Sequence, residues 1–496
     1  MTDMKRDLGP LDSTVSLRLN NMHDNGVVQR IWERDYTVWK HDPTEITDRL
    51  GWLDLPDTMR PRVDGLNSFA ETTEQYDRIV LLGMGGSSLA PEVLSLTFGG
   101  RPLTALDTTH PAAIKEVEEA GDLRRTLFIV ASKSGTTVET LSQFAYFFDR
   151  TQDGSQFVAI TDPGSKLEEI AREKGFRRAF LNPPDVGGRY SALSYFGLVP
   201  AALIGVDIGA LLDAAARMAA ACREPEPNNP AALLGAAIAE AALAGCDKLT
   251  ILTDERISSF GTWLEQLIAE STGKEGKGVV PVEGEPPGPA DVYGGDRLFA
   301  GIGVEPALSP SLSIPFESKD DLGAEFFRWQ FATAVAGRVL GIHPFDQPNV
   351  QEAKDATGRL LSEPGLPPLE RGDLHQTLES VRPGDYIALH AYIPRTAENE
   401  SRLQAVRVRL RDRYRVATTV GFGPRFLHST GQLHKGGPNT GVFVQIVDEP
   451  GIDLPVPGRE YTFRRLLDAQ SAGDLEALRS HGRLVARVQL EELEEV

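Results

Sequence analysis

The amino-acid sequence predicts an α/β protein with mainly parallel sheets flanked by helices. Short apolar runs alternate with helical patterns from about residue 76 onward, which is typical of strands buried in a parallel sheet. Glycine and hydroxyl residues follow several of these runs, as expected where strands end at a ligand site. The chain of 496 residues is also too long for one ordinary core. We therefore expect two or three domains.

Residues 1–75 are polar, and we expect them to form a helical segment that wraps around the rest of the protein. Trp32, Trp39 and Trp52 are the candidate anchors of this segment, because large aromatic side chains contribute much buried area.

The first α/β unit is expected over residues 76–222. Each of its strands is a short apolar run that ends in glycine or hydroxyl residues. The predicted strands lie in RIVLLGMGGSS (78–88), PLTALDTT (102–109), TLFIVASKSGTT (126–137) and QFVAIT (156–161). Helical patterns between them include SLAPEVLSLTF (88–98) and VETLSQFAYFFDR (138–150).

The second unit is expected over residues 223–496, with additions in its C-terminal part. A proline-rich stretch, residues 222–232, marks the crossing into it. Strands are predicted in DKLTILTD (247–254) and DRLFAGIGV (296–304), and helices in residues 257–272 and 324–341. The additions include DYIALHAYIP (385–394), residues 401–414, GVFVQIVDE (441–449) and a final strand in RLVARVQLEE (483–492).

Composition and charge narrow the classes of function. A formal net charge of -20 argues against nucleic-acid binding, which favours clustered Lys and Arg. The least polar run, residues 231–246, is too short to span a bilayer, so we expect no membrane partner. Cys222 and Cys246 suggest neither a disulfide framework nor a metal site. Together with the lack of an apolar signal core at the N-terminus, this favours the cytoplasm.

Two strand ends carry residues that suit an anionic ligand. Ser132–Thr137 combine four hydroxyls, a lysine and a glycine just before a predicted helix. Hydroxyls and free amides at a helix start can bind a phosphate, although the same residues can simply cap the helix. Gly83, Gly85 and Gly86 follow another strand and let a ligand approach the backbone, with Ser87 as a donor. Neither a dinucleotide nor a mononucleotide fingerprint is complete, which leaves a smaller phosphorylated ligand.

Two charged side chains are candidates for proton chemistry. Arg189 follows a glycine pair and could reach an enediolate or a phosphate, or lie in a solvated surface turn. Gln266 and Glu270 are four residues apart, so they share one face of a helix. A carboxylate near the C-terminal end of a helix is not favoured by the helix dipole, which suggests a base, although a solvated helix end remains an alternative.

Histidines and further polar residues follow later in the chain. Asp346, Gln347 and Lys354 lie in PFDQPNVQEAK (344–354), and His428 and His434 in residues 425–441. Histidine can move protons near neutral pH. The other histidines are read as packing residues, and no metal site or cofactor is predicted from the spacing.

Taken together, these motifs resemble the phosphoglucose isomerase family, which is built from two sugar-isomerase domains. The matching segments are GMGGSSLAP, ASKSGTTVET, VGGRYSALS, EQLIAESTGKEG and PFDQPNVQEAK, in the family's order over residues 80 to 354. With STGQLHKGGPNTG (429–441), they look most like the isomerase half of transaldolase–isomerase fusion proteins. No transaldolase-sized barrel fits beside two isomerase domains, so no transaldolase activity is expected.

The resemblance implies the reversible isomerisation of glucose 6-phosphate and fructose 6-phosphate through a cis-enediol(ate), in glycolysis and gluconeogenesis, without metal or cofactor. Gly86 and Ser87 would contact the sugar phosphate. Glu270 would move the proton between C2 and C1, and Arg189 would stabilise the enediol(ate). The residues that hold the phosphate would be Ser132, Lys133, Ser134 and Thr137. Gln266 and Gln347 would line the sugar, and Lys354 and His428 would assist ring opening.

This chain departs from the family in two places. Ser134 and Gly135 stand where the family commonly has Thr and an aromatic residue. The histidine motif usually precedes the lysine motif, whereas His428 follows Lys354, and His434 is the other candidate for its role. Two alternatives stay open, namely a dual phosphoglucose/phosphomannose isomerase and a non-catalytic sugar-phosphate sensor. The resemblance also suggests a homodimer.

Overall fold

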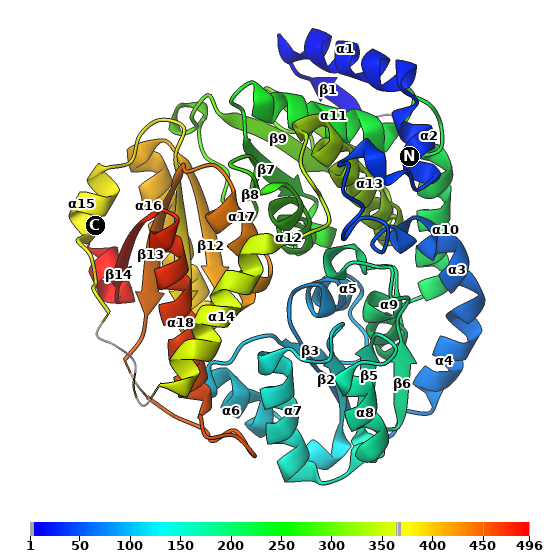
Figure 1. Ribbon diagram of the computed structural model, residues 1–496, viewed down its shortest axis with the longest axis vertical. Coiled ribbons are helices and arrows are strands. Elements are labelled where there is room, and N and C mark those ends of the chain that lie inside the picture. Colours follow the sequence, from blue (N-terminus) through cyan, green and yellow to red (C-terminus); the bar gives the residue numbers. More distant parts are fainter. Residues whose placement is uncertain (1–3, 364, 366–368, 450, 496) are drawn as a thin grey trace.

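Three sheets flanked by helices form the framework of the protein (Figure 1). The computed structural model describes residues 4–363, 365, 369–449 and 451–495. Within these ranges every strand pair is parallel except that of β1 (Lys5–Asp7) with β10 (Ser311–Ile314). The α/β prediction is therefore confirmed.

The first sheet has five parallel strands in the order β3-β2-β4-β5-β6. Its strands are β2 (Arg78–Gly83), β3 (Leu103–Leu106), β4 (Thr126–Ala131), β5 (Phe157–Thr161) and β6 (Arg178–Leu181). Its helices are α5 (Leu89–Phe98), α6 (Pro111–Glu119), α7 (Val138–Thr151), α8 (Lys166–Glu173) and α9 (Tyr195–Ile204). The central strand β4 is buried along its whole length, as the apolar run TLFIVA requires.

The second sheet has the order β1-β10-β9-β7-β8. Its remaining strands are β7 (Lys248–Thr253), β8 (Val280–Val282) and β9 (Arg297–Ile302). Its helices are α10 (Ile208–Ala221), α11 (Pro230–Leu243), α12 (Phe260–Thr272) and α13 (Leu322–Leu340). The short strand β1 therefore joins the polar N-terminal segment to this sheet.

The last third of the chain forms a sheet of its own, in the order β12-β11-β13-β14. Its strands are β11 (Tyr386–Tyr392), β12 (Ala417–Phe422), β13 (Gly441–Val447) and β14 (Leu484–Val488). Its helices are α14 (Pro348–Ser362), α15 (Leu374–Glu379), α16 (Ala397–Tyr414), α17 (Gly431–Gly436), α18 (Phe463–Ser480) and α19 (Leu490–Glu494). Among the described residues none of these strands pairs with the second sheet.

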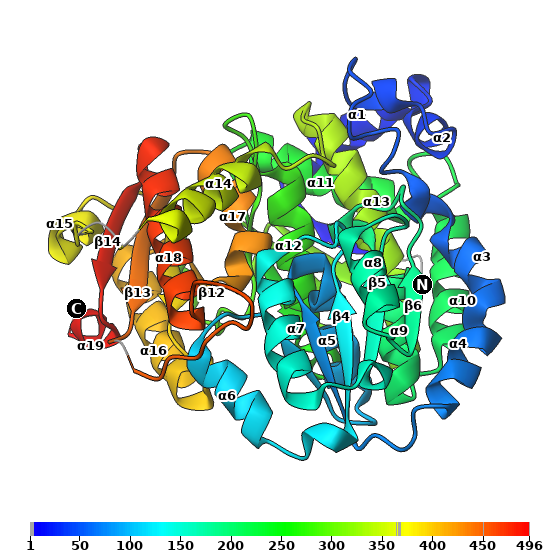
Figure 2. The ribbon, with the colours of Figure 1, turned by 60° about the horizontal axis from the view of Figure 1, so that its bottom comes forward.

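Helices α14 and α18 contact each other on the side of the third sheet that faces the first unit (Figures 1 and 2). Phe463, at the start of α18, belongs to the apolar cluster of the first sheet and meets the ring of Tyr146 edge to face. The third sheet is therefore packed against the first unit as well as being close to the second.

Several short elements were missed by sequence reasoning. In the strands β1, β6, β8, β10 and β12, polar residues, proline or glycine interrupt or flank the few apolar residues, so no clear apolar run marks them. The predicted final strand over 483–492 is wrong in its second half, because the chain turns into helix α19 after Val488. Gln489 and Glu492 form a capping box there, which stabilises the start of that helix.

The N-terminal segment contains α1 (Leu11–Asp24), α2 (Val27–Trp32), α3 (Leu55–Met59) and α4 (Val63–Glu71). Figure 1 shows α3 and α4 along the outer edge, beside α10 and α9. Trp32 and Trp52 pack against Phe327 of α13, and Trp39 Nε1 donates to Ala334 O at 2.8 Å. The three tryptophans thus anchor this segment as predicted.

Helices α11 and α13 of the second unit pack closely against each other. A Cβ atom at Gly235 would lie 2.2 Å from Ala332 O, so only glycine allows this approach. The alanine-rich run that contains Gly235 is a buried helix, as expected. None of the helices within the described ranges is long and apolar enough to cross a membrane.

We predict that Gly235→Ala destabilises the protein by about 1–3 kcal/mol, because the added methyl group overlaps a backbone carbonyl that cannot move freely. Gly65→Ala in helix α4 is the matched control, since a Cβ at Gly65 meets nothing within 4 Å. That change should be neutral or stabilising by up to ~1 kcal/mol. Thermal unfolding of both variants is the measurement, and equal midpoints would contradict the packing described here.

Candidate active site

The turn between β4 and α7 carries the predicted phosphate-binding residues. Ser132 Oγ lies 2.9 Å from Thr137 Oγ1, and Ser134 Oγ lies 3.0 Å from Thr136 Oγ1. Gly135 adopts φ +68°, and its N–H donates to Ser132 Oγ at 3.1 Å. A Cβ at this glycine would lie 2.5 Å from the backbone nitrogen of Leu167, so an aromatic residue would not fit here. The turn is a compact loop of hydroxyls at the start of a helix.

A cavity of about 330 Å³ opens beside this turn. Ser134, Thr136 and Thr137 line one side of it, and Lys354 of α14 and His428 line another. Free backbone amides at the start of α7 and the exposed cation of Lys354 favour an anion at this place.

Lys133 is not brought to the cavity. Its ammonium group pairs with the Asp162 carboxylate and donates to Pro184 O at 2.9 Å. Ser132 lies behind the cavity wall, where its hydroxyl supports Gly135 and Thr137. Of the four residues predicted to hold a phosphate, Ser134 and Thr137 therefore face the cavity.

Glu270 lies near the end of helix α12, but it is only 5% exposed. Gln266, one turn earlier, donates from Nε2 to Glu270 Oε2 at 3.0 Å. Arg189 Nη1 lies 3.5 Å from Glu270 Oε1. The alternative of a solvated helix end is therefore excluded, and the carboxylate is held between an amide and a guanidinium group.

Arg189 is buried and fixed on all sides of its guanidinium group. Its Nε donates to Ser271 Oγ at 2.8 Å, and its Nη2 donates to Pro344 O at 2.8 Å and Asp346 O at 2.9 Å. Its Nη1 reaches Gln347 Oε1 at 3.4 Å. The alternative of a solvated surface arginine is excluded. The side chain instead joins α12 to the loop that precedes α14.

The glycine loop after β2 packs against two other parts of this site. A Cβ at Gly86 would lie 2.1 Å from Gly188 O, beside Arg189, and a Cβ at Gly85 would lie 2.7 Å from His428 O. Gly86 and the following Ser87 are partly exposed at this junction. Only residues without a side chain let the three backbone segments approach so closely.

Gln266 connects Glu270 to the segment that contains His428. Besides Glu270, its Nε2 donates to His428 O at 2.8 Å. Glu270 does not itself line the 330 Å³ cavity, whereas His428 does. The segment Arg425–His428 (η11) therefore links the buried carboxylate to the cavity that holds Ser134, Thr137 and Lys354.

The partner of His428 was missed by sequence reasoning. His428 Nε2 lies 2.9 Å from Glu139 Oε1, and Gln470 of α18 donates to the same oxygen at 2.8 Å. Burial raises the pKa of Glu139, but His428, together with a backbone hydrogen bond and the nearby Lys354, outweighs this and leaves that pKa below its usual value. An acidic residue in the first turn of a helix is common for structural reasons, so no local pattern signals this role.

His434 lies elsewhere, in the interior of the third unit. It is 3% exposed and its ring packs against that of His390 in a tilted arrangement, with ring centroids 4.6 Å apart. Burial, with His390 and Lys435 nearby, holds the pKa of His434 well below its usual value. Of the two candidate histidines, His428 is the one that faces the cavity.

Comparisons with known proteins converge on one family. The family model of phosphoglucose isomerase matches residues 51–283. A probable glucose-6-phosphate isomerase of Methanococcus maripaludis is 28% identical over 378 residues, which cover 64% of this chain and 85% of the relative. The glucose-6-phosphate isomerase of Prochlorococcus marinus is 30% identical over 349 residues, which cover 58% of this chain and 67% of the relative.

Solved structures share the fold. A hypothetical protein from Thermus thermophilus aligns with a TM-score of 0.64 and 24% identity, over 73% of this chain and 100% of that chain. A glucose-6-phosphate isomerase from Chlamydia trachomatis aligns with a TM-score of 0.60 and 18% identity, over 71% of this chain and 87% of that chain.

We predict that inorganic phosphate binds at the 132–137 turn and protects the protein against thermal unfolding. Thr137→Val should weaken the binding by about tenfold, because it removes a hydroxyl that faces the cavity while keeping the shape of the side chain. The control is Thr58→Val, whose exposed hydroxyl bonds its own helix at Asp54 O. Titration calorimetry measures the affinity, and equal values for the two variants would contradict the assignment.

Proposed function

Because the chain belongs to the phosphoglucose isomerase family, we propose that it interconverts glucose 6-phosphate and fructose 6-phosphate. One observation carries most weight for this chain itself. The buried Glu270 carboxylate lies beside Arg189 and is joined through Gln266 to His428, which lines the cavity of the hydroxyl turn. A carboxylate, a guanidinium group and an imidazole are thus connected beside the cavity of the hydroxyl turn, which supports this proposal.

In this proposal the sugar phosphate is anchored by its phosphate group. Ser134 and Thr137 would donate hydroxyl hydrogen bonds, together with amides at the start of α7. Ser132 would support the turn from behind, and Gly86 and Ser87 would contact the sugar chain. Binding energy gained at the phosphate, away from the reacting carbons, would position C1 and C2.

Ring opening would use His428 and Lys354. The bond between C1 and the ring oxygen breaks, the C1 hydroxyl loses its proton to form the aldehyde, and the ring oxygen gains a proton. His428 is held by Glu139 at 2.9 Å, which orients the imidazole for this exchange. Lys354 lines the same cavity and would support the developing charge on the ring oxygen.

Isomerisation would then use Glu270 as the base. Its carboxylate removes the proton from C2, the electron pair forms the C1–C2 double bond, and the C1 oxygen gains negative charge. Arg189 would stabilise that charge, while Gln266 and Gln347 would hold the sugar hydroxyls. Return of the proton to C1, with transfer of the C2 hydroxyl proton to the C1 oxygen, yields the ketose. The steps consume no oxidant or reductant.

All of the residues assigned a role here belong to one chain. The family also suggests a homodimer, which we propose as the form in solution. In this arrangement a second copy is not required to supply His428, since that residue already contacts Glu139 and Gln266 of its own chain.

Glu270→Gln should lower turnover by about 10²–10⁴-fold or more, because the amide cannot accept the C2 proton. Binding of glucose 6-phosphate should persist, since the phosphate contacts are untouched. The conversion of fructose 6-phosphate to glucose 6-phosphate is followed with a coupled dehydrogenase, and binding by calorimetry. Glu275→Gln is the control, because Glu275 is exposed and pairs with Lys40 at 2.8 Å. Unchanged turnover in Glu270→Gln would refute the mechanism.

The same assay should be insensitive to a chelator. The proposed steps use a carboxylate, a guanidinium group and a histidine in place of a metal ion. After dialysis against EDTA the protein should retain its full rate of isomerisation. A loss that added Mg²⁺ or Zn²⁺ reverses would contradict a metal-free reaction.

A further inference from the structure

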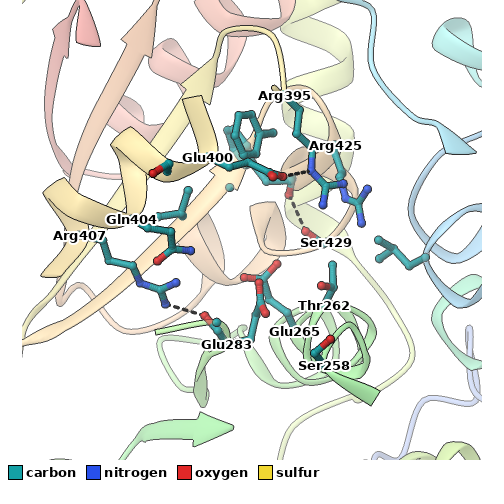
Figure 3. A pocket seen from close by; sticks show the side chains of 17 residues that line it. Ser258, Thr262, Glu265, Glu283, Arg395, Glu400, Gln404, Arg407, Arg425 and Ser429 are labelled. Atoms are coloured by element: carbon teal, nitrogen blue, oxygen red, sulfur yellow. Dashed lines mark hydrogen bonds and ion pairs between the residues drawn. The ribbon is translucent and has the colours of Figure 1, made fainter. Parts of the chain in front are cut away.

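A second polar cavity, of about 540 Å³, lies where the three units meet (Figure 3). Helix α12 and the turn just before it supply Ser258, Thr262 and Glu265 to its wall, and Glu283 joins them directly after β8. Helix α16 supplies several polar side chains, among them Gln404. The mechanism proposed above uses none of these residues.

The segment η11 (Arg425–His428) separates this cavity from the proposed active site. Phe426 and Ser429 line the second cavity, whereas Leu427 and His428 line the first. The two cavities have no lining residue in common. The second cavity is therefore separate from the first, although the same segment forms a wall of both.

Hydrogen-bond acceptors without partners face the second cavity. Within the described residues, nothing donates to the side-chain carboxyl of Glu265 or Glu283. Glu265 is only 7% exposed. Gln404 Oε1 is buried and likewise has no donor among the described residues. Buried polar groups without partners are costly, so a ligand rich in hydrogen-bond donors would be favoured here.

Of the three arginines that line this cavity, Arg395 and Arg425 are paired with carboxylates. Arg395 pairs with Glu400 at 2.7 Å and Glu92 at 2.9 Å, and Arg425 pairs with Asp107 at 2.9 Å. Arg407 Nη2 donates to Thr418 O at 2.7 Å and to the backbone carbonyl of Glu283. Because Glu92, Glu400 and Asp107 already neutralise Arg395 and Arg425, Glu265 and Glu283 face only the charge of Arg407. When both are ionised, the group therefore carries a net negative charge that favours a cationic ligand.

The environment of the cavity raises the pKa of both the Glu265 and the Glu283 carboxyl. Burial and the neighbouring Glu283 raise the pKa of Glu265 to about 8, against the lowering effect of Arg407 and Arg425. Burial also raises the pKa of Glu283, although Arg407, Arg425 and Arg395 oppose it and Glu92 adds to it. Near neutral pH the two carboxyls therefore retain a proton that a bound cation would displace.

We propose that this cavity binds a small polyhydroxylated primary amine, with its ammonium group between the Glu265 and Glu283 carboxyls. Figure 3 places these two residues at the centre of the cavity, with Arg407 on one side and Arg425 on the other. Gln404 Oε1 accepts from a hydroxyl of the ligand, and Arg407 Nη1, which has no hydrogen bond among the described residues, donates to another. The hydroxyls that complete the site belong to Ser258, Thr262 and Ser429.

Titration calorimetry with D-glucamine and sorbitol tests this proposal. The two probes differ only in an amine or a hydroxyl at one carbon, so they isolate the contribution of the ammonium group. D-glucamine should bind at least about tenfold more tightly than sorbitol, since a charged hydrogen bond replaces a neutral one. Its affinity should rise about tenfold between pH 6 and pH 7, because binding releases the shared proton below a pKa of about 8.

Single substitutions test where on the protein D-glucamine binds. Glu265→Gln should lose at least about tenfold in affinity for D-glucamine and show a weaker pH dependence, because only Glu283 then titrates in the cavity. Glu305→Gln is the matched control, because Glu305 is exposed and lies 3.7 Å from Lys5. Glu270→Gln should bind D-glucamine as the unchanged protein does, which excludes the proposed active site as the place of binding. Circular dichroism checks that each variant is folded.

The proposal is overturned if D-glucamine does not bind, if sorbitol binds equally well, or if the affinity is independent of pH in the unchanged protein. It is also overturned if a folded Glu265→Gln variant keeps the full affinity. The pH series needs no variant, so a Glu265→Gln protein that failed to fold would still leave the proposal open to refutation.

Discussion

The buried guanidinium group of Arg189 joins helix α12 to the loop before α14, two parts of the site that share no strand. It donates to Ser271 of α12 and to the carbonyls of Pro344 and Asp346 before α14, and it lies 3.5 Å from Glu270. Lys274 approaches the same loop, donating to Asp346 Oδ1 at 2.6 Å. Burial and the nearby Arg189 lower the pKa of Lys274 to about 8, although Asp346 opposes this.

The charges of Arg189, Lys274, Glu270 and Asp346 have to be considered together. An uncompensated charge at this depth would be costly, so two cations and two carboxylates stabilise one another. The geometry of Glu270 therefore depends on a loop that lies about seventy residues further along the chain. A substitution in that loop would act on the Glu270 carboxylate through Arg189, without contacting Glu270 itself.

Much of the fold could be predicted because buried parallel strands leave a strong local pattern. The run TLFIVA and the glycine loop after β2 identify two strand ends, and the four-residue spacing of Gln266 and Glu270 gives their shared face. The third sheet was read as an addition to the second unit, since a sequence does not reveal which strands pair. The strands β1, β6, β8, β10 and β12 were missed because their apolar residues are few or are interrupted by polar residues, proline or glycine.

The contacts of the site were less predictable, because they join residues distant in sequence. Glu139 and His428 are 289 residues apart, and Gln470 is 331 residues from Glu139. Its neighbours in the sequence made Lys133 a candidate phosphate ligand, but its ammonium group pairs with the Asp162 carboxylate. Local sequence can supply the residue types of a site. The tertiary fold decides which of them face the ligand.

The order of the chain also has a consequence for its synthesis. The 132–137 turn leaves the ribosome early, whereas His428 and Gln470, which surround the same Glu139 carboxylate, are added far later. A nascent chain in which the first two sheets have already formed still exposes that carboxylate to water. The hydrogen bonds that connect Glu139 to His428 and Gln470 therefore form only once translation has passed Gln470.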